Sequence, residues 1–343
     1  MPPPVRIALA GLGDIGVRAH LPAILREPGA ELAALVEPDP GKRAAAARLA
    51  PGVPAAAELG EVLDAVDAVV LATPAWVTPQ LAREALAAGV HVLAEKPLAP
   101  TLAEQLAFRD VPGAAERLQI GLTYRHHPAI ARLREIVSAG ALGHPLYVQS
   151  SLADERADPD GEPEHYARRL RTLEHGLPVV FDGIHRCDQL NLVLGEAPVD
   201  VTGWALRTRP EYASPNVNGA LLGYADGTLV RLEVIWLVPS LPPSQFVVTG
   251  PRGRVAIDPP TFALTAEIDG RTEELRAPGD KTEVCFALQL EGFVAACVEG
   301  RPPTPGLEDA LAASALCERI AQACLAEQRR ERAAEDRGAD VAR

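Results

Sequence analysis

Three short clusters in this 343-residue chain combine residue types and spacings that suit chemistry. They are a glycine loop, Gly11-Leu-Gly13-Asp-Ile-Gly16, the triplet Glu95-Lys96-Pro97, and the run Gly183-Ile-His185-Arg-Cys-Asp188. A glycine loop of this spacing can hold the pyrophosphate of a dinucleotide. A lysine can hydrogen-bond the oxygen of a reacting alcohol or carbonyl, and histidine side chains exchange protons near neutral pH. The clusters therefore predict a bound dinucleotide together with side chains that can bind or exchange protons with a second ligand.

The glycine loop lies between an apolar run of strand length, Val5–Ala10, and a segment with helical spacing, Val17–Leu25. Gly11 permits a tight turn, Gly13 lets the backbone approach a pyrophosphate, and Gly16 lets the helix pack on the strand. The free N–H groups and the positive dipole at the helix start favour phosphate. The alternative is a glycine turn that binds no nucleotide, and the strand–loop–helix context disfavours it.

Glu37 follows the next expected strand, Leu32–Val36. An acid about 20 residues after the glycines can accept hydrogen bonds from the adenosine ribose hydroxyls, and it repels a 2′-phosphate. The sequence therefore predicts NAD in preference to NADP. Lys42 and Arg43 follow shortly after and weaken that preference.

Alternating strands and helices continue to about residue 123 and predict a doubly wound parallel sheet. Further strands are expected at 65–72, 90–94 and 119–123, with helices at 78–88 and from about 102. Ligands bind such sheets at the carboxyl ends of the strands. The expected cofactor-binding residues lie at or just past such ends: Gly11, Gly13, Asp14, Ile15, Gly16, Glu37, Thr73, Pro74, Trp76, Glu95 and Lys96.

Beyond about residue 145 the pattern becomes that of a largely antiparallel sheet. The expected strands are 145–152, 200–207, 219–224, 229–238, 245–249 and 254–257. Asp226-Gly227 and Asp269-Gly270 are hairpin turn signals. A loop is expected at 154–164, one helix at 178–194, and closing helices at 281–299 and 307–326.

The predicted fold class is therefore α/β. It consists of a Rossmann domain at 1–124, an α+β domain at 125–327, and a frayed tail at 328–343.

Composition excludes several classes of partner. The 33 basic and 46 acidic residues leave a net charge of −13, which disfavours nucleic acid and anionic membrane surfaces. No apolar stretch reaches the ~18–20 residues that cross a bilayer, and no secretory signal is seen at the N-terminus. The five cysteines form no C-x-x-C pair and no visible metal-ligand cluster. We therefore expect free thiols, no metal and a cytoplasmic location.

The order and spacing of the motifs resemble one oxidoreductase family. The resemblance rests on the glycine loop, Thr73-Pro74, Ala-Gly-Val-His-Val-Leu-Ala before Glu95-Lys96-Pro97, Gly121-Leu-Thr-Tyr124-Arg125, and Gly-Ile-His185-x-x-Asp188. In these features the chain, apart from its tail, is similar to the glucose–fructose oxidoreductase, inositol dehydrogenase and rhizopine catabolism (Gfo/Idh/MocA) family. The resemblance implies a Rossmann domain with a nicotinamide dinucleotide. It also implies a substrate domain whose sheet often mediates dimers or tetramers, and oxidation or reduction at a sugar or cyclitol ring carbon.

The resemblance also implies a catalytic set of Lys96, His185 and an aspartate four residues before that histidine. Phe181 stands at that position, and the acid is Asp182, three residues before His185. Positions three and four apart share a helix face, so Asp182 could serve if the helix start is irregular; it could equally be displaced. The expected substrate-binding residues are Lys96, Tyr124, Arg125, His127, Tyr166, Asp182 and His185; for His127 and Tyr166 the alternative is an ordinary surface position.

We expect an NAD-dependent dehydrogenase or ketoreductase that acts on a ring hydroxyl. Two alternatives are an NAD-binding regulator without activity, and an enzyme that recycles tightly bound NAD for epimerisation, glycoside cleavage or dismutation. The acids within 154–164 would suit a cationic substrate such as an amino sugar or aminoglycoside, and a solvated loop is the alternative.

Overall fold

The structure, a computed structural model, describes residues 2–341, and in the last helix it describes side chains as far as Glu327. The chain divides into two compact units. The first comprises residues up to His127 together with Pro278–Ala312, and the second comprises Pro128–Ala277 and the chain from Ala313 onward. The segment Pro278–Ala312, which the sequence analysis assigned to the second domain, thus groups with the first unit.

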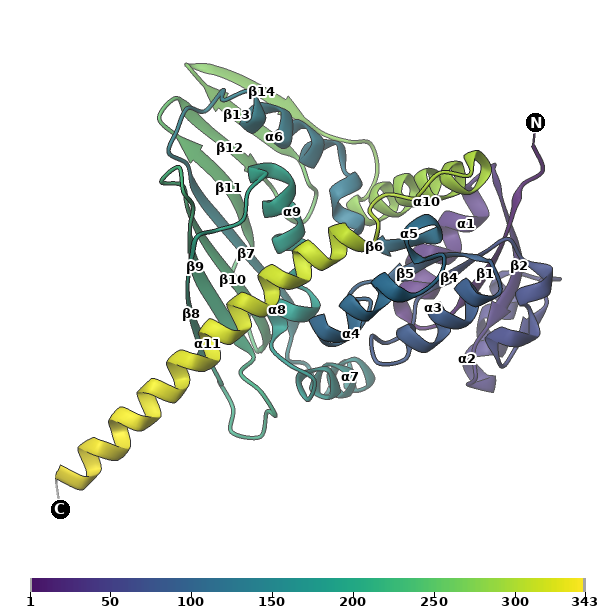
Figure 1. Ribbon diagram of the computed structural model, residues 1–343, viewed down its shortest axis with the longest axis horizontal. Coiled ribbons are helices and arrows are strands. Elements are labelled where there is room, and N and C mark those ends of the chain that lie inside the picture. Colours follow the sequence, from purple (N-terminus) through teal and green to yellow (C-terminus); the bar gives the residue numbers. More distant parts are fainter. Residues whose placement is uncertain (1, 342–343) are drawn as a thin grey trace. The chain divides into compact units, whose positions relative to one another are not determined.

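A parallel six-stranded sheet forms the centre of the first unit (Figure 1). Its strands, in the spatial order β3-β2-β1-β4-β5-β6, are β1 (Val5–Ala10), β2 (Ala30–Val36), β3 (Ala55–Ala56), β4 (Ala68–Leu71), β5 (His91–Glu95) and β6 (Leu118–Gly121). Every neighbouring pair is parallel. The strand order reverses between β1 and β4, and such a reversal is where open α/β sheets bind ligands. The predicted doubly wound sheet is confirmed.

Short helices connect these strands. They are η1 (Gly16–His20), α1 (Leu21–Arg26), α2 (Pro40–Leu49), η2 (Leu59–Glu61), η3 (Leu63–Ala65), α3 (Thr78–Ala87), α4 (Leu102–Leu106), η4 (Ala107–Asp110), α5 (Ala114–Arg117) and η5 (Thr123–His126). The helix expected at 17–25 begins as a π-helical turn, η1. Helix α2, in which Ala46 is the buried residue, was not predicted from the sequence.

Helix α10 (Lys281–Glu299) belongs to the first unit because its apolar face completes that unit's core. Phe286, Leu290 and Phe293 of α10 pack with Ile7 and Leu9 of β1 in one buried cluster. Burying an aliphatic or aromatic side chain of this size stabilises a fold by about 1.5–3 kcal/mol.

The second unit is built on an eight-stranded sheet. Its strands, in the order β14-β13-β12-β11-β7-β10-β9-β8, are β7 (Tyr147–Arg156), β8 (Asp200–Leu206), β9 (Val217–Gly223), β10 (Leu229–Val238), β11 (Gln245–Gly250), β12 (Gly253–Ile257), β13 (Leu264–Ile268) and β14 (Arg271–Leu275). All pairs are antiparallel except β7 with β10. The largely antiparallel sheet and both hairpins are as predicted. Helices α6 (Pro128–Ser138) and α9 (Ile184–Leu194) lie side by side against it (Figure 1).

The loop predicted at 154–164 is wrong at both ends. Strand β7 continues to Arg156, so Asp154 and Glu155 lie on a strand, and helix α7 (Pro163–Leu173) begins before residue 164. Strand pairing explains the difference, because Glu155 lies opposite Trp236 of β10. This pairing outweighs the low strand propensity of acidic residues.

The single helix predicted at 178–194 is two helices, α8 (Pro178–Phe181) and α9. Between them, the N–H groups of Asp182 and Gly183 both donate to the carbonyl oxygen of Pro178. Gly183 is needed there, because a Cβ at this position would lie 2.6 Å from the Cα of Val179. The irregular helix start that would let Asp182 act in place of an aspartate four residues before His185 is therefore present.

The last helix, α11, runs from Leu307 to Val341. The helix predicted to end at residue 326 therefore continues through most of the segment predicted as a frayed tail, 328–343, whose side chains lie outside the described residues. Within the described part of the chain, none of the helices combines the length and the apolar character needed to cross a membrane. All five cysteines are free thiols, as predicted.

Candidate active site

The glycine loop follows β1 at the carboxyl edge of the parallel sheet. Gly11 has φ +90°, and a Cβ there would lie 2.4 Å from the carbonyl oxygen of Ala72. A Cβ at Gly16 would lie 2.0 Å from the carbonyl oxygen of Gly11, so the chain's own packing requires both glycines. At Gly13 a Cβ would meet no heavy atom within 4 Å. Open space beside an unobstructed backbone fits the pyrophosphate that the loop is expected to hold.

Glu37 fixes the loop from the end of β2. Its Oε2 accepts the Leu12 N–H at 2.9 Å, and its Oε1 accepts the Asp39 N–H at 3.1 Å. A carboxylate has about four acceptor positions, so capacity remains for ribose hydroxyls. The guanidinium of Arg43 donates to the carbonyl oxygens of Glu37 and Pro38 and holds the turn after the strand.

The turn after β4 lies at the same edge. Thr73 and Pro74 begin it, and the buried hydroxyl of Thr78 lies 2.7 Å from the Thr73 hydroxyl. Two large apolar side chains of the predicted cofactor set, Ile15 and Trp76, are 48% and 41% exposed. Asp14 is exposed as well. Exposed apolar groups near a loop with open space suit contact with a ligand.

Lys96 follows β5 directly, and Glu95 holds its backbone. Oε2 of Glu95 accepts the Lys96 N–H at 3.2 Å, and Oε1 lies 2.9 Å from Nε2 of His20. Sequence reasoning missed His20. Its signal was a histidine one turn beyond Gly16 within an apolar stretch, because a buried polar side chain needs a partner.

Residues after β6 supply the remaining predicted groups of the first unit. The guanidinium of Arg125 donates to Oδ1 of Asp309 at 2.9 Å. The ammonium of Lys281 lies 5.3 Å from the ring centroid of Tyr124. His127 is buried, and this burial lowers the pKa of its imidazole, which Lys281 lowers further. A neutral imidazole at neutral pH follows.

Asp182, His185 and Tyr166 lie in the second unit. Asp182 directly follows α8, and His185 lies in the first turn of α9. The backbone N–H of His185 donates to the carbonyl oxygen of Asp182 at 3.2 Å. Each of these two residues is 8% exposed. The hydroxyl of Tyr166, on α7, donates to the hydroxyl of Tyr212 at 3.5 Å.

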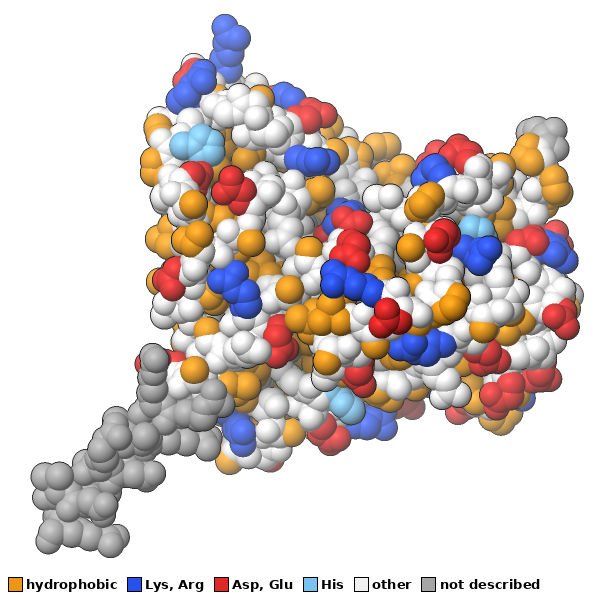
Figure 2. Space-filling model, viewed as in Figure 1, with side chains coloured by type: hydrophobic (Ala, Val, Ile, Leu, Met, Phe, Trp, Pro, Cys, Tyr) orange, Lys and Arg blue, Asp and Glu red, His pale blue; other side chains and the backbone are white. Residues whose placement is uncertain are grey.

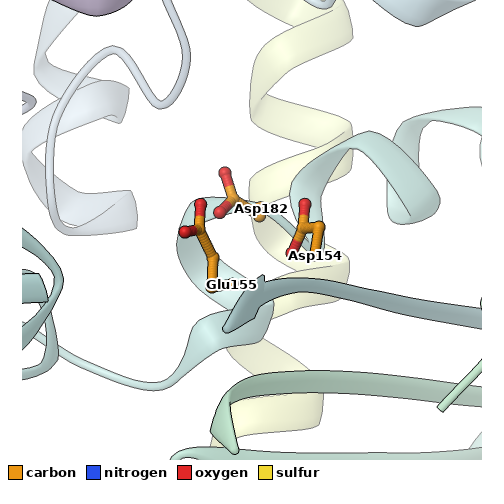
Figure 3. Close-up of side chains that lie close together, drawn as sticks. All are labelled: Asp154, Glu155 and Asp182. Carbon is orange, nitrogen blue, oxygen red and sulfur yellow. The ribbon is translucent and has the colours of Figure 1, made fainter. Parts of the chain in front are cut away.

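The carboxylate of Asp182 belongs to a group of three acids. Asp154 and Glu155 project from the end of β7 toward Asp182, and the three offer oxygens within 4.8 Å of one another (Figure 3). Arg169 of α7 pairs with Glu155 and, at 3.3 Å, with Asp182. Its guanidinium lies 5.0 Å from the ring centroid of Trp236. Arg169 thus provides the positive charge that a metal ion would otherwise bring to two of these acids. That the protein binds no metal stays a prediction.

His165 extends this network, which sequence reasoning missed. Its Nε2 bonds to Glu155, and its Nδ1 lies 2.7 Å from the guanidinium of Arg168. Burial raises the pKa of Glu155, Asp182 raises it further, and Arg169 and His165 lower it. The signal was helical spacing, since residues 165, 168, 169 and 172 share one face of α7.

Comparison with known proteins adds to this geometry. Residues 5–111 match the model of an oxidoreductase family with an NAD-binding Rossmann fold, and residues 130–256 match the Gfo/Idh/MocA C-terminal domain. The chain belongs to the Gfo/Idh/MocA oxidoreductase family. The resemblance drawn from the motifs is confirmed, and so are the oxidoreductase class and NAD as cofactor.

This Gfo/Idh/MocA chain is 28% identical over 334 residues to inositol 2-dehydrogenase 2 of Paenarthrobacter aurescens, covering 93% of this chain and 96% of that protein. It is 41% identical over 152 residues to the inositol 2-dehydrogenase of Leifsonia xyli, a match that spans 43% of this chain and only 44% of that protein. Among solved structures, the aldose-aldose oxidoreductase from Caulobacter crescentus complexed with glycerol is 26% identical. Its TM-score is 0.80, and the match covers 94% of this chain and 98% of that one.

Proposed function

We propose that this protein is an NAD-dependent dehydrogenase or ketoreductase that acts on a ring carbon of a sugar, cyclitol or amino sugar. The observation that carries the proposal is the meeting, at one edge of the parallel sheet, of the open glycine loop, the acid Glu37 and Lys96. The named activities of the relatives, inositol 2-dehydrogenases among them, support a polyol substrate.

In this proposal each catalytic residue has one role. When bound, the nicotinamide supplies the hydride chemistry. Lys96 hydrogen-bonds the reacting oxygen, and His185 takes the hydroxyl proton during oxidation and returns it during reduction. Asp182, which pairs with Arg169, supports the positive charge that His185 acquires. Tyr124, Arg125, His127 and Tyr166 shape the substrate site.

A substrate panel tests the proposal. Inositols, aldoses, amino sugars and aminocyclitols are incubated with NAD or NADP, and absorbance at the NADH band is followed. We expect turnover with at least one cyclic polyol, and a preference for NAD because Glu37 repels a 2′-phosphate. A protein that binds NAD yet reduces it with no member of the panel would contradict the proposal and favour a regulator. Cofactor that co-purifies and is never released would favour the recycled-NAD alternative.

A cationic substrate is the finer part of the proposal. Asp154, Asp160, Glu162 and Glu164 are exposed, whereas Glu155 is buried and paired with Arg169. Exposed carboxylates attract a cationic ligand, and salt screens that attraction. An aminocyclitol or aminoglycoside is then expected to lose kcat/KM steeply as salt rises. Equal rates on neutral inositol at every ionic strength would remove this part.

We also propose a homodimer or homotetramer formed through the sheet of the second unit. Five exposed apolar residues share one face of that sheet, as the strand register requires: Tyr147, Trp204, Leu206, Leu221 and Leu229. Several large apolar side chains exposed on one face of a sheet mark a candidate protein interface. Light scattering after size exclusion is expected to show an oligomer that Leu221→Lys dissociates; a monomeric parent would contradict the interface.

Two further expectations concern location and other partners. Five free thiols support a reducing compartment, and we propose the cytoplasm. Basic and acidic side chains are interspersed over the face in Figure 2, which offers no basic stripe for nucleic acid or an anionic membrane.

A further inference from the structure

We propose that His20 is a positioning residue for Lys96, acting through Glu95. The proposal rests on the function proposed for Lys96. None of the relatives' names and no motif of the sequence analysis assigns a role to this histidine. The three residues come from separate places in the first unit: His20 ends η1, Glu95 ends β5, and Lys96 follows it.

The two carboxylate oxygens of Glu95 have different partners, one on the helical turn η1 and one on the backbone just after β5. Oε1 lies 2.9 Å from Nε2 of His20, and Oε2 accepts the N–H of Lys96 at 3.2 Å. The side chain of His20 is 2% exposed and that of Glu95 is 13% exposed. In this water-poor setting a lost hydrogen bond is not replaced by solvent, so the contact defines where the carboxylate lies.

Packing leaves the pair little freedom to move. The ring of Phe286 meets the ring of His20 edge-on, with centroids 4.8 Å apart at 84°. On the other side, a Cβ at Gly121 would lie 3.2 Å from the Glu95 carboxylate, so β6 approaches it closely. The Glu95 carboxylate therefore has one orientation, set by His20, and the backbone of Lys96 is tied to it.

His20 is the last residue of the π-helical turn, and its side chain reaches Glu95 at the end of β5. Gly16–His20 follows the glycine loop, and Val17 N–H bonds back to the carbonyl oxygen of Gly13. His20 thus joins the segment that carries the glycine loop to the strand end that carries Lys96. Hydride transfer needs both to be held in register, because a displacement of about 1 Å can cost about 100-fold in rate.

The experiment compares three variants. His20→Gln places an amide nitrogen where Nε2 stands and can keep the bond to Glu95. His20→Asn carries the same amide on a side chain one carbon shorter. Its nitrogen lies near the position of Nδ1 and cannot reach Glu95. Phe286→Leu removes the ring contact and leaves the bond, and it is the matched control for lost packing. Kinetics on the best substrate, NAD affinity, and hydrogen exchange at the Lys96 amide in the NAD-free protein are measured for each.

We expect His20→Asn to lower kcat about tenfold with KM and NAD affinity within about twofold of the parent. We also expect faster exchange at the Lys96 amide. His20→Gln and Phe286→Leu are expected to keep kcat within about threefold, with parental exchange. Equal kcat for His20→Gln and His20→Asn, or an equal loss in Phe286→Leu, would overturn the proposal.

The exchange measurement separates this proposal from the proposed function. It needs neither substrate nor cofactor. If no polyol is turned over but the Lys96 amide still exchanges faster in His20→Asn than in His20→Gln, the positioning role stands and the proposed reaction fails. Parental exchange in His20→Asn contradicts the positioning role whatever the reaction is.

Discussion

Glu37 accepts the backbone N–H of Leu12 at 2.9 Å, so the acid that ends β2 also holds the glycine loop after β1. The sequence predicted an acid facing the ribose, and the structure adds that the same carboxylate orders the loop. Its second oxygen accepts the N–H of Asp39. The loop conformation depends on this side chain, and we propose that the cofactor preference depends on it too.

Glu37→Gln tests this double role. The amide keeps one acceptor oxygen and loses the charge that repels a 2′-phosphate. We expect kcat/KM for NAD to fall about tenfold, with a smaller loss for NADP and little change in kcat. Steady-state kinetics with both cofactors measure the change. Glu31→Gln, an exposed acid on β2, the strand that Glu37 follows, is the control. An unchanged ratio of NAD to NADP would show that Glu37 sets no preference.

Gly13→Ala and Gly16→Ala are expected to fail in different ways. A Cβ at Gly13 meets open space, so folding is preserved, and the methyl group would occupy the space expected for the cofactor. A Cβ at Gly16 would lie 2.0 Å from a carbonyl oxygen, and overpacking of this kind costs about 1–3 kcal/mol. Thermal unfolding and NAD titration separate the two. Equal stability losses, with NAD affinity retained in Gly13→Ala, would contradict this division of roles.

The strand ends were predictable because the buried parallel strands are continuous apolar runs and the glycine loop follows one of them directly. This local pattern is enough to place Gly11, Glu37 and Lys96 at one edge of the sheet. The interruption of the helix at Asp182 could be given from the sequence only as a possibility. It depends on local hydrogen bonds and on the close approach of Val179 to Gly183, which the sequence does not show.

Contacts distant in sequence explain most of the rest. His20 and Glu95 are far apart in the chain, and the sequence around either residue does not indicate that the two are in contact. Strand β7 extends beyond its predicted end because Glu155 pairs with a residue of β10 and its carboxylate forms an ion pair with Arg169. Such contacts compensate for poor local propensity, and a single sequence does not reveal them.

Arg169→Met is expected to destabilise the second unit. The variant leaves Glu155 and Asp182 as buried acids without their cation, which costs about 3–5 kcal/mol when one partner of a buried pair is removed. Urea unfolding measures the loss. Arg156→Met, an exposed arginine on the same strand as Glu155, is the control. An Arg169→Met variant as stable as the parent would show that the acids are stabilised by other groups.

The same variant has a pH signature. Burial raises the pKa of Glu155 in the folded protein above its ordinary value of 4.5. Protonated Glu155 therefore contributes stability below pH 4.5, and this contribution is lost as the pH rises through the pKa of the folded state. Arg169 lowers this pKa, so removing it raises the pKa further. The gap in unfolding free energy between parent and Arg169→Met is expected to widen from about pH 4.5 to neutral. A gap that narrows over this range would contradict the assignment.

Lys96→Met tests the central claim most directly. The variant keeps an unbranched side chain as far as the Cε position and removes the ammonium that would hydrogen-bond the reacting oxygen. NAD affinity and turnover of the best polyol are measured side by side, with Lys42→Met, an exposed lysine, as the control. The account predicts NAD affinity within about twofold of the parent and turnover reduced by about 100-fold or more. Full turnover in Lys96→Met would contradict it.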